Sequence, residues 1–184
     1  MRSRLSALPA LLLLGALVAV LLPSPSAGAA PLTMTPSRAI ERLAPYQPQT
    51  TCSPTPKPGT VALRRLITRA YGGTGDYGIV RACRIGGRSE HKEGRAWDWK
   101  VSIRNRTQVR QVNDMLHWLF AHDRYGNDFA QARRLGVMYV IWNHRIWTTS
   151  TRSWRVYRGA DPHTNHVHFS LSWAGALKRT SYWT

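Results

Sequence analysis

The sequence predicts an α+β domain with a small, mostly antiparallel sheet and helices packed on one side of it. Apolar residues follow helical spacing early and in the middle of the chain, and short stretches rich in β-branched and aromatic residues flank these segments. The chain has 184 residues and shows no internal repeat. One domain with its own core is therefore expected.

The N-terminus has the pattern of an export signal. Arg2 and Arg4 precede an apolar run from Leu5 to Leu22, and Ala27-Gly28-Ala29 then matches the small residues of a cleavage site. We predict a signal peptide over residues 1–29 and a secreted, extracellular protein. The alternative is a retained membrane anchor, for which the apolar run is marginal in length. No transmembrane span is expected after cleavage.

Three helices are predicted from apolar spacing and from residues that start and stop helices. The first ends before Gly72, and the second carries the clearest apolar stripe. Asn127 would cap the third, with Gly136 as its C-terminal stop. The expected bounds are about 60–70, 107–122 and 127–135.

Four strands are predicted from runs of β-branched and aromatic residues, at residues 79–84, 95–101, 137–143 and 166–172. In the second of these strands, alternation places Ala96 and Asp98 on one face and Trp97 and Trp99 on the other. Before the first helix, residues 30–59 are rich in Pro, Thr and Ser and predict an extended lead-in segment. The folded domain is expected over residues 60–184.

The chain is strongly basic, with a formal net charge of +17. A charge of this sign favours polyanionic partners, such as nucleic acid, anionic lipid or the anionic polymers of a bacterial wall. The Lys and Arg residues are scattered and form no tract of the kind that marks a nucleic-acid arm. For an exported protein we therefore expect a wall polymer as the partner, and no specific nucleic acid.

Two cysteines, Cys52 and Cys83, are present. An even number of cysteines in an exported chain predicts a disulfide, here between the lead-in segment and the stretch before residue 89. The alternative is two free thiols. Neither cysteine has CxxC spacing, which argues against a zinc finger.

Two distant segments together predict a metal site. The first runs from Ser89 to Asp98 and contains His91, and the second runs from His163 to His168 and contains a His-x-His pattern. His166 and His168 leave the same face of their predicted strand. Two imidazoles and one carboxylate suit Zn²⁺, and three protein ligands leave a position open for water.

The predicted roles follow from zinc chemistry. The ligands would be His91, Asp98 and His168, and a general base is needed because zinc lowers the pKa of its water. His166 is the preferred base or oxyanion stabiliser. His163 is the other candidate, Asp161 could orient either imidazole, and Ser89 could orient a ligand from outside. Three further histidines are expected to be ordinary surface or core residues: His117, His122 and His144.

The first motif, Ser89-x-His91-x-x-Gly94-x-Ala96-x-Asp98, resembles the SxHxxGxAxD signature of the D-Ala-D-Ala metallopeptidases, a group that includes lysostaphin-type enzymes and the hedgehog domain. The distal His-x-His is similar to that group's HxH, and the resemblance extends from about residue 52 to residue 173. It implies a hedgehog-like or peptidase-like fold, zinc at the three ligands and a catalytic His166. It also implies that an arginine, best matched by Arg81, holds a substrate carboxylate. Many relatives have Glu where this chain has Asn165.

The leading hypothesis is a secreted, monomeric zinc peptidase of the cell wall. It would act on peptidoglycan stem peptides or cross-bridges as a D,D- or L,D-type carboxypeptidase or an endopeptidase. The first alternative is a non-catalytic, zinc-containing wall-binding module in which Trp142, Trp147 and Trp154 line a groove. The second is a secreted nuclease, for which no nucleic-acid motif is present.

Overall fold

The computed structural model describes residue 32 and residues 39–184. The predicted signal peptide, residues 1–29, lies outside the described residues. Within the described part, no helix has both the length and the apolar character needed to cross a membrane.

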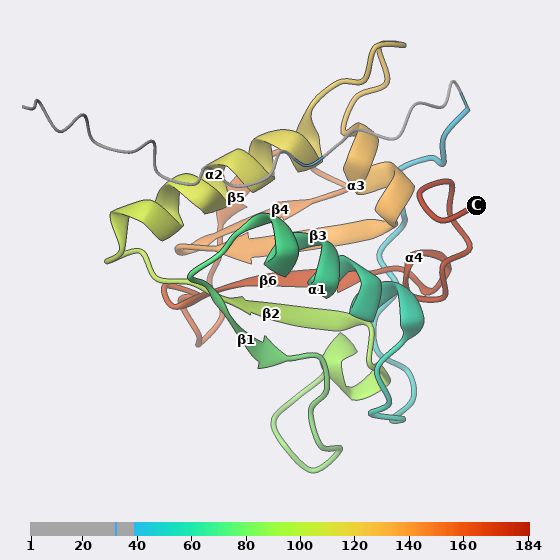
Figure 1. Ribbon diagram of the computed structural model, residues 1–184. Helices are drawn as coiled ribbons and strands as arrows, with labels where there is room; N and C mark the ends of the chain where they lie inside the picture. Colours follow the sequence, from blue (N-terminus) through green and yellow to red (C-terminus); the bar gives the residue numbers. More distant parts are fainter. Residues whose placement is uncertain (1–31, 33–38) are drawn as a thin grey trace, which may run out of the picture.

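Six strands form one antiparallel sheet in the order β1-β2-β6-β3-β4-β5 (Figure 1). The prediction of an α+β domain with an antiparallel sheet is confirmed. The order places β6, the last strand of the sequence, between β2 and β3, so the two predicted metal motifs lie on neighbouring strands. The strands are β1 (Gly75–Gly78), β2 (Ala96–Lys100), β3 (Val137–Trp142), β4 (Arg145–Thr148), β5 (Trp154–Val156) and β6 (His166–Leu171).

Within residues 39–184, four α-helices and one short 3₁₀ helix accompany the sheet: α1 (Pro58–Ala70), α2 (Arg106–Phe120), α3 (Ala130–Leu135), α4 (Trp173–Ala176) and η1 (Glu90–Glu93). The Asn105 side chain caps α2 by accepting from the backbone N–H groups of Thr107 and Gln108. Gly136 ends α3 in the left-handed conformation, with φ of 69°, as expected.

The predicted cap of the third helix is wrong. The helix begins at Ala130, after Phe129, and not at Asn127. Asn127 instead donates its backbone N–H and its side-chain amide to the two carboxylate oxygens of Asp123. These hydrogen bonds close a tight loop before the helix, which delays the helical start by two residues.

The strand predicted at residues 79–84 is also wrong. The strand lies earlier, at β1, and ends at Gly78, which adopts φ of 105° beside a register shift in the pairing with β2. The Asp76 carboxylate accepts from the Gly78 N–H at 2.7 Å and fixes this bend. Ile79 and the residues after it therefore leave the sheet and form a loop across its open face.

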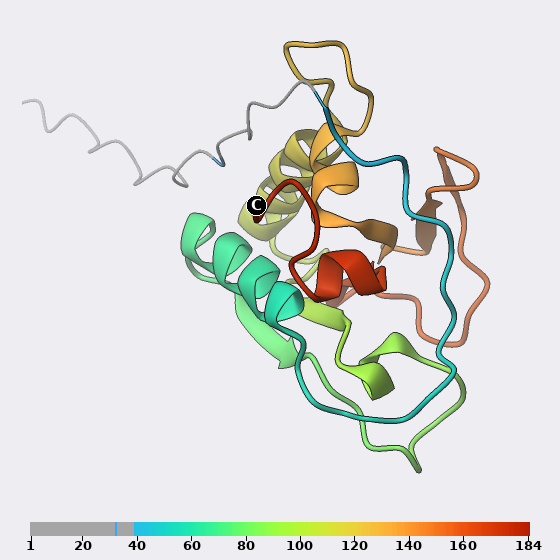
Figure 2. The same ribbon diagram turned by 90° about the vertical axis from the view of Figure 1, so that its right-hand side faces the viewer.

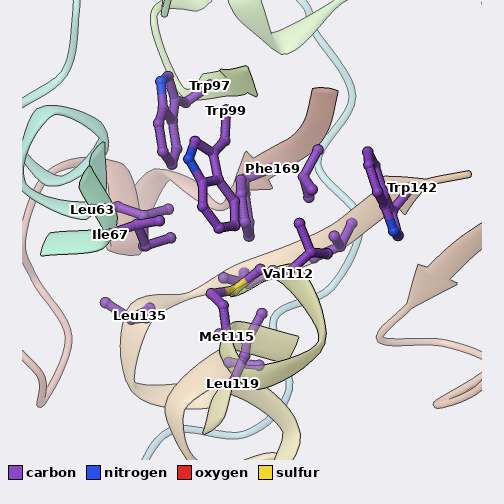
Figure 3. Packing of buried hydrophobic residues seen from close by; sticks show 14 of the residues in the cluster. Leu63, Ile67, Trp97, Trp99, Val112, Met115, Leu119, Leu135, Trp142 and Phe169 are labelled. Atoms are coloured by element: carbon purple, nitrogen blue, oxygen red, sulfur yellow. The ribbon is translucent and has the colours of Figure 1, made fainter. Parts of the chain in front are cut away.

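The core lies between the helices and one face of the sheet (Figure 2). Trp97, Trp99 and Phe169 are fully buried on this face, and all four α-helices contribute side chains to the same cluster. Figure 3 shows these rings beside Leu63 and Ile67 of α1. The alternation predicted for β2 is confirmed, because its tryptophans face the helices and leave Asp98 on the opposite face.

Two tryptophans expected at a surface groove belong to the core instead. Trp142 and Trp147 are buried in the hydrophobic cluster, and Trp154 is partly buried against it. The Phe120 ring of α2 lies 4.3 Å from the Trp147 ring, centroid to centroid. Trp147 therefore stabilises the packing of β4 against α2, whereas Trp154 also lines a surface cavity together with Leu116 and Phe120.

The lead-in segment packs along the sheet face that the helices leave open (Figure 2). Residues 39–57 form no helix or strand, in agreement with the predicted extended conformation. The disulfide between Cys52 and Cys83 is present, with the two Cα atoms 5.9 Å apart. It joins the lead-in segment to the loop that follows β1, so the predicted pairing is confirmed.

A buried ion pair holds the lead-in segment in place. Glu93 and Arg95 have fully buried side chains, and the Arg95 guanidinium donates to the Glu93 carboxylate at 2.7 and 2.8 Å. The other carboxylate oxygen accepts the backbone N–H groups of Thr50 and Thr51 at 3.0 and 2.9 Å. Arg95 also donates to the carbonyl of Gln47. The pair therefore links the lead-in to η1 and β2, which carry His91 and Asp98.

Replacing Glu93 with alanine is expected to lower the free energy of unfolding by about 3–5 kcal/mol, because it leaves the buried Arg95 charge without its partner. Urea unfolding followed by circular dichroism measures the change. Arg64→Ala is the matched control, since Arg64 pairs with Asp76 at the exposed surface at 3.0 Å and such pairs contribute about 0–1 kcal/mol. Equal effects of both substitutions would contradict the assigned role of the buried pair.

The ion pair between Glu93 and Arg95 also makes the stability of the folded protein depend on pH. Burial opposes ionisation of Glu93, but hydrogen bonds from Thr51, Thr50 and Arg95 outweigh it and lower the pKa of the carboxyl. The stabilisation is therefore complete above the unfolded-state pKa of about 4.3 and is lost as the pH falls through the lower folded-state value.

Candidate metal centre

The pairing of β2 with β6 brings two predicted ligands side by side. Asp98 lies directly opposite His168 in the antiparallel register. Both side chains project from the face away from the helices, because their strand neighbours Trp97, Trp99 and Phe169 fill the core. Residues that are 70 positions apart in the sequence thus meet at one point on the sheet.

The third predicted ligand comes from η1, next to this pair. The Ser89 hydroxyl accepts from the His91 backbone N–H and caps the short helix. Gly94 then reverses the chain with φ of 68°, and a Cβ there would lie only 1.9 Å from the Thr55 carbonyl oxygen. Glycine is therefore required at this turn, which returns the chain into β2 and leaves His91 against the sheet.

The three ligand side chains converge on one point. The Nε2 atom of His91 lies 3.1 Å from Asp98 Oδ2 and 3.2 Å from His168 Nδ1. The same His168 nitrogen lies 2.8 Å from Asp98 Oδ1. Donor atoms held about 2 Å from a single tetrahedral Zn²⁺ are about 3.3 Å apart, so the observed triangle needs only a small expansion to enclose the ion.

The position of the proton on the His91 imidazole agrees with a cation at this site. Its Nδ1 lies 2.8 Å from the carbonyl oxygen of Ile79, which can only accept, so Nδ1 carries the proton. The Nε2 lone pair therefore points at the Asp98 carboxylate, and both groups are buried away from bulk solvent. A shared cation stabilises this arrangement, and the backbone contact fixes the imidazole in the ligating tautomer.

The electrostatics of Asp98 agree with a ligand role. Burial opposes its ionisation, but a positive charge shared with His168 and His91, carried by an extra proton where no metal is bound, outweighs burial and holds the pKa of the carboxyl far below its usual range. Asp98 is therefore a carboxylate at all ordinary pH values. The His168 ring is fixed from its other side by Tyr139, whose ring stacks on it with centroids 5.4 Å apart.

His166, the predicted base, lies beside the three ligands without joining them. Its Nε2 is 3.7 Å from Asp98 Oδ1, and its Nδ1 is 2.6 Å from the side-chain oxygen of Asn165. An amide oxygen can only accept, so Nδ1 carries the proton and the Nε2 lone pair faces the site. Burial lowers the pKa of His166, which keeps the imidazole neutral near pH 7.

His163 and Asp161 form a second group at the same opening. The His163 Nδ1–H donates to the Asp161 backbone carbonyl at 2.7 Å, and the Asp161 carboxylate accepts the His163 backbone N–H. Burial lowers the pKa of His163 to about 4. Ligand atoms of Asp161, His163 and His166 lie within 4.8 Å of one another, so these residues could hold a metal as well.

A cavity of about 210 Å³ opens onto these groups, and it contains both expected and unexpected residues. Arg81 and Ser89 line it, as do the predicted base and Asp161. Ser89 was expected to orient a ligand side chain, but its hydroxyl contacts the His91 backbone. The carbonyl of Ile79 orients the His91 imidazole. Sequence analysis did not single out four other lining residues: Arg88, Tyr139, Ile141 and Tyr157.

The sequence matches one protein family over the region that builds this site. A family model described as VldE, C-terminal domain, matches residues 52–168. The chain belongs to the VldE C-terminal domain family. The matched stretch of this VldE C-terminal domain runs from the first cysteine of the disulfide to the last ligand of the metal site. No curated protein and no solved structure matches the chain.

Proposed function

We propose that this VldE C-terminal domain is an exported zinc peptidase that hydrolyses an amide bond in the peptide part of peptidoglycan. The convergence of His91, Asp98 and His168 beside an open cavity, which Asp98 and His168 line, carries the proposal. Three protein ligands, with a cavity on the fourth side, are typical of a catalytic zinc and not of a structural one.

The residues around the ligands have separate tasks in this proposal. Bound zinc would activate a water molecule and polarise the scissile carbonyl. His166 would accept the proton from that water and return it to the departing amine, because its Nε2 lone pair faces the ligands and its imidazole is neutral. Since that nitrogen carries no hydrogen before the reaction, the role of base is favoured over that of oxyanion stabiliser.

The charges at the cavity wall favour a substrate with a carboxylate. Arg81 and Arg88 both line the cavity beside Ser89. Guanidinium groups bind carboxylates through paired hydrogen bonds, so either arginine is suited to the free carboxylate of a peptide. This feature favours cleavage beside a residue that carries a free carboxylate, as in a short stem peptide, over cleavage in the middle of a long chain.

Peptidoglycan is the substrate class that best fits the rest of the chain. The sequence predicts an export signal and has a net charge of +17, and the structure contains a disulfide. A basic exported protein is attracted to an anionic wall, where peptides with free carboxylates are abundant. The catalytic domain would therefore act outside the cell, in association with the wall.

Digestion of purified muropeptides tests the proposal. The exported protein is loaded with one equivalent of Zn²⁺, and mass spectrometry is expected to detect products that have gained one water molecule. Treatment with a chelator should stop the reaction, and added zinc should restore it. Bound zinc and wall affinity without any cleavage would instead support a non-catalytic wall-binding module. A protein that binds no zinc would contradict both functions.

A further inference from the structure

A second cavity adjoins the metal cavity. Its volume is about 400 Å³, and it shares a wall of three side chains with the metal cavity: Tyr139, Ile141 and Tyr157. The two cavities thus lie next to each other, and one molecule that passes these three side chains would contact both. The groups that touch the scissile bond lie in the smaller cavity, so the larger cavity would receive a neighbouring part of the substrate.

The lining of the second cavity differs in character from that of the first. The metal cavity contains arginines, aspartates and histidines, whereas the described residues that line the larger cavity include no charged side chain. Met138, Ile141 and Ile146 supply apolar surface, while tyrosines and the hydroxyl groups of Thr148 and Ser150 supply polar atoms. A charged group would find no countercharge here, so a neutral ligand with apolar and hydroxyl-bearing parts is favoured.

Tyr46 provides an aromatic ring at this cavity, and its backbone is anchored on both sides. The carbonyl of Ala44 accepts the Thr149 hydroxyl at 2.7 Å, and the N–H of Gln47 donates to the Met138 sulfur at 3.2 Å. The Tyr46 side chain nevertheless remains 61 % exposed. The backbone on either side of the ring is thus held in place while the ring stays open to solvent, which makes the ring available for stacking.

We propose that the cavity beside Tyr46 binds a neutral N-acetylated sugar ring whose attached peptide enters the metal cavity. A sugar ring has an apolar face for the tyrosines and hydroxyl groups for Thr148 and Ser150, and its acetamido methyl group suits the apolar side chains. This inference rests on the proposed function and narrows its substrate to a glycopeptide, cleaved close to the sugar.

The inference is tested by sugar binding to the zinc-free protein, so that it does not depend on catalysis. The probe is N,N′-diacetylchitobiose, a neutral disaccharide, titrated into isotope-labelled protein and followed by NMR. Shifts are expected at Ser150, Ile146 and the residues around position 46, with a Kd on the order of millimolar. Tyr46→Ala is expected to weaken binding by about fivefold to tenfold.

Tyr125→Ala is the matched control, because Tyr125 is another partly exposed tyrosine, 39 % exposed, outside both cavities. It should leave the titration unchanged. Absence of shifts at the Tyr46 cavity, or shifts caused only by a sugar-free stem peptide, would overturn the inference and leave an apolar side-chain subsite in its place. Sugar binding without muropeptide cleavage would contradict the proposed peptidase function and uphold the sugar site.

Discussion

Replacing His168 with alanine is expected to abolish zinc binding and, with it, all hydrolysis. The substitution removes the Nδ1 atom that lies 2.8 Å from Asp98 and 3.2 Å from His91, so only two ligands remain. A two-ligand site in water holds zinc far more weakly than a three-ligand site. Elemental mass spectrometry should find one zinc per wild-type chain and none in the variant, and kcat/KM should fall to background.

His117→Ala is the matched control for this experiment. His117 lies exposed on α2, among the histidines expected to have no special role, so its removal should change neither zinc content nor activity. Circular dichroism of the His168 variant must show an intact fold, since His168 is also buried against Tyr139. Full zinc occupancy in a folded His168→Ala protein would refute the assigned ligand set.

The ligand residues were within reach of sequence analysis because each is marked by a local pattern. Alternation in the strand around Asp98 follows from two tryptophans that must be buried, and His-x-His on a strand places both imidazoles on one face. The register that sets Asp98 opposite His168 depends on pairing between distant strands. No local pattern in the sequence encodes that register, so the convergence was a hypothesis until the sheet was known.

Other parts of the site depend on contacts that no motif signals. The Ile79 carbonyl orients His91 only because the chain leaves the sheet after Gly78, whereas the sequence predicts a strand that begins at Ile79. The strands β4 and β5 were missed because they are short, with four and three residues. Their absence from the prediction also hid the cavity at Tyr46, which is built from β3, β4 and the lead-in segment.

The peptidase group that the first motif resembles often has Glu where this chain has Asn165, and the structure gives this difference a meaning. At this position a glutamate could serve as the base, whereas an amide cannot take up a proton. Asn165 instead receives the Nδ1–H of His166 at 2.6 Å, which leaves the Nε2 lone pair facing the ligands. We therefore interpret Asn165 as a positioning residue: it orients the proposed base, His166, and does not itself take up the proton.

Replacing His166 with alanine is the second prediction with a large expected effect. The variant should keep its zinc, because His91, Asp98 and His168 are unchanged, but kcat should fall by about 10²–10⁴-fold, the range expected for loss of a general base. Zinc content by elemental mass spectrometry and muropeptide cleavage rates measure the two parts separately. This separation distinguishes a base from a ligand, since loss of His168 removes metal and rate together.

Two variants of Asn165 test how His166 is held. Asn165→Ala removes the acceptor of the Nδ1–H and should lower kcat while leaving zinc content unchanged, because the imidazole can then rotate or change tautomer. Asn165→Asp restores an acceptor of the same shape and should recover most of the rate.

Full activity of His166→Ala would assign the base to His163. The His163 imidazole is also neutral at pH 7 and adjoins that of His166, with ring centroids 4.5 Å apart. If His166→Ala is inactive while both Asn165 variants are fully active, the base assignment stands and the positioning role does not.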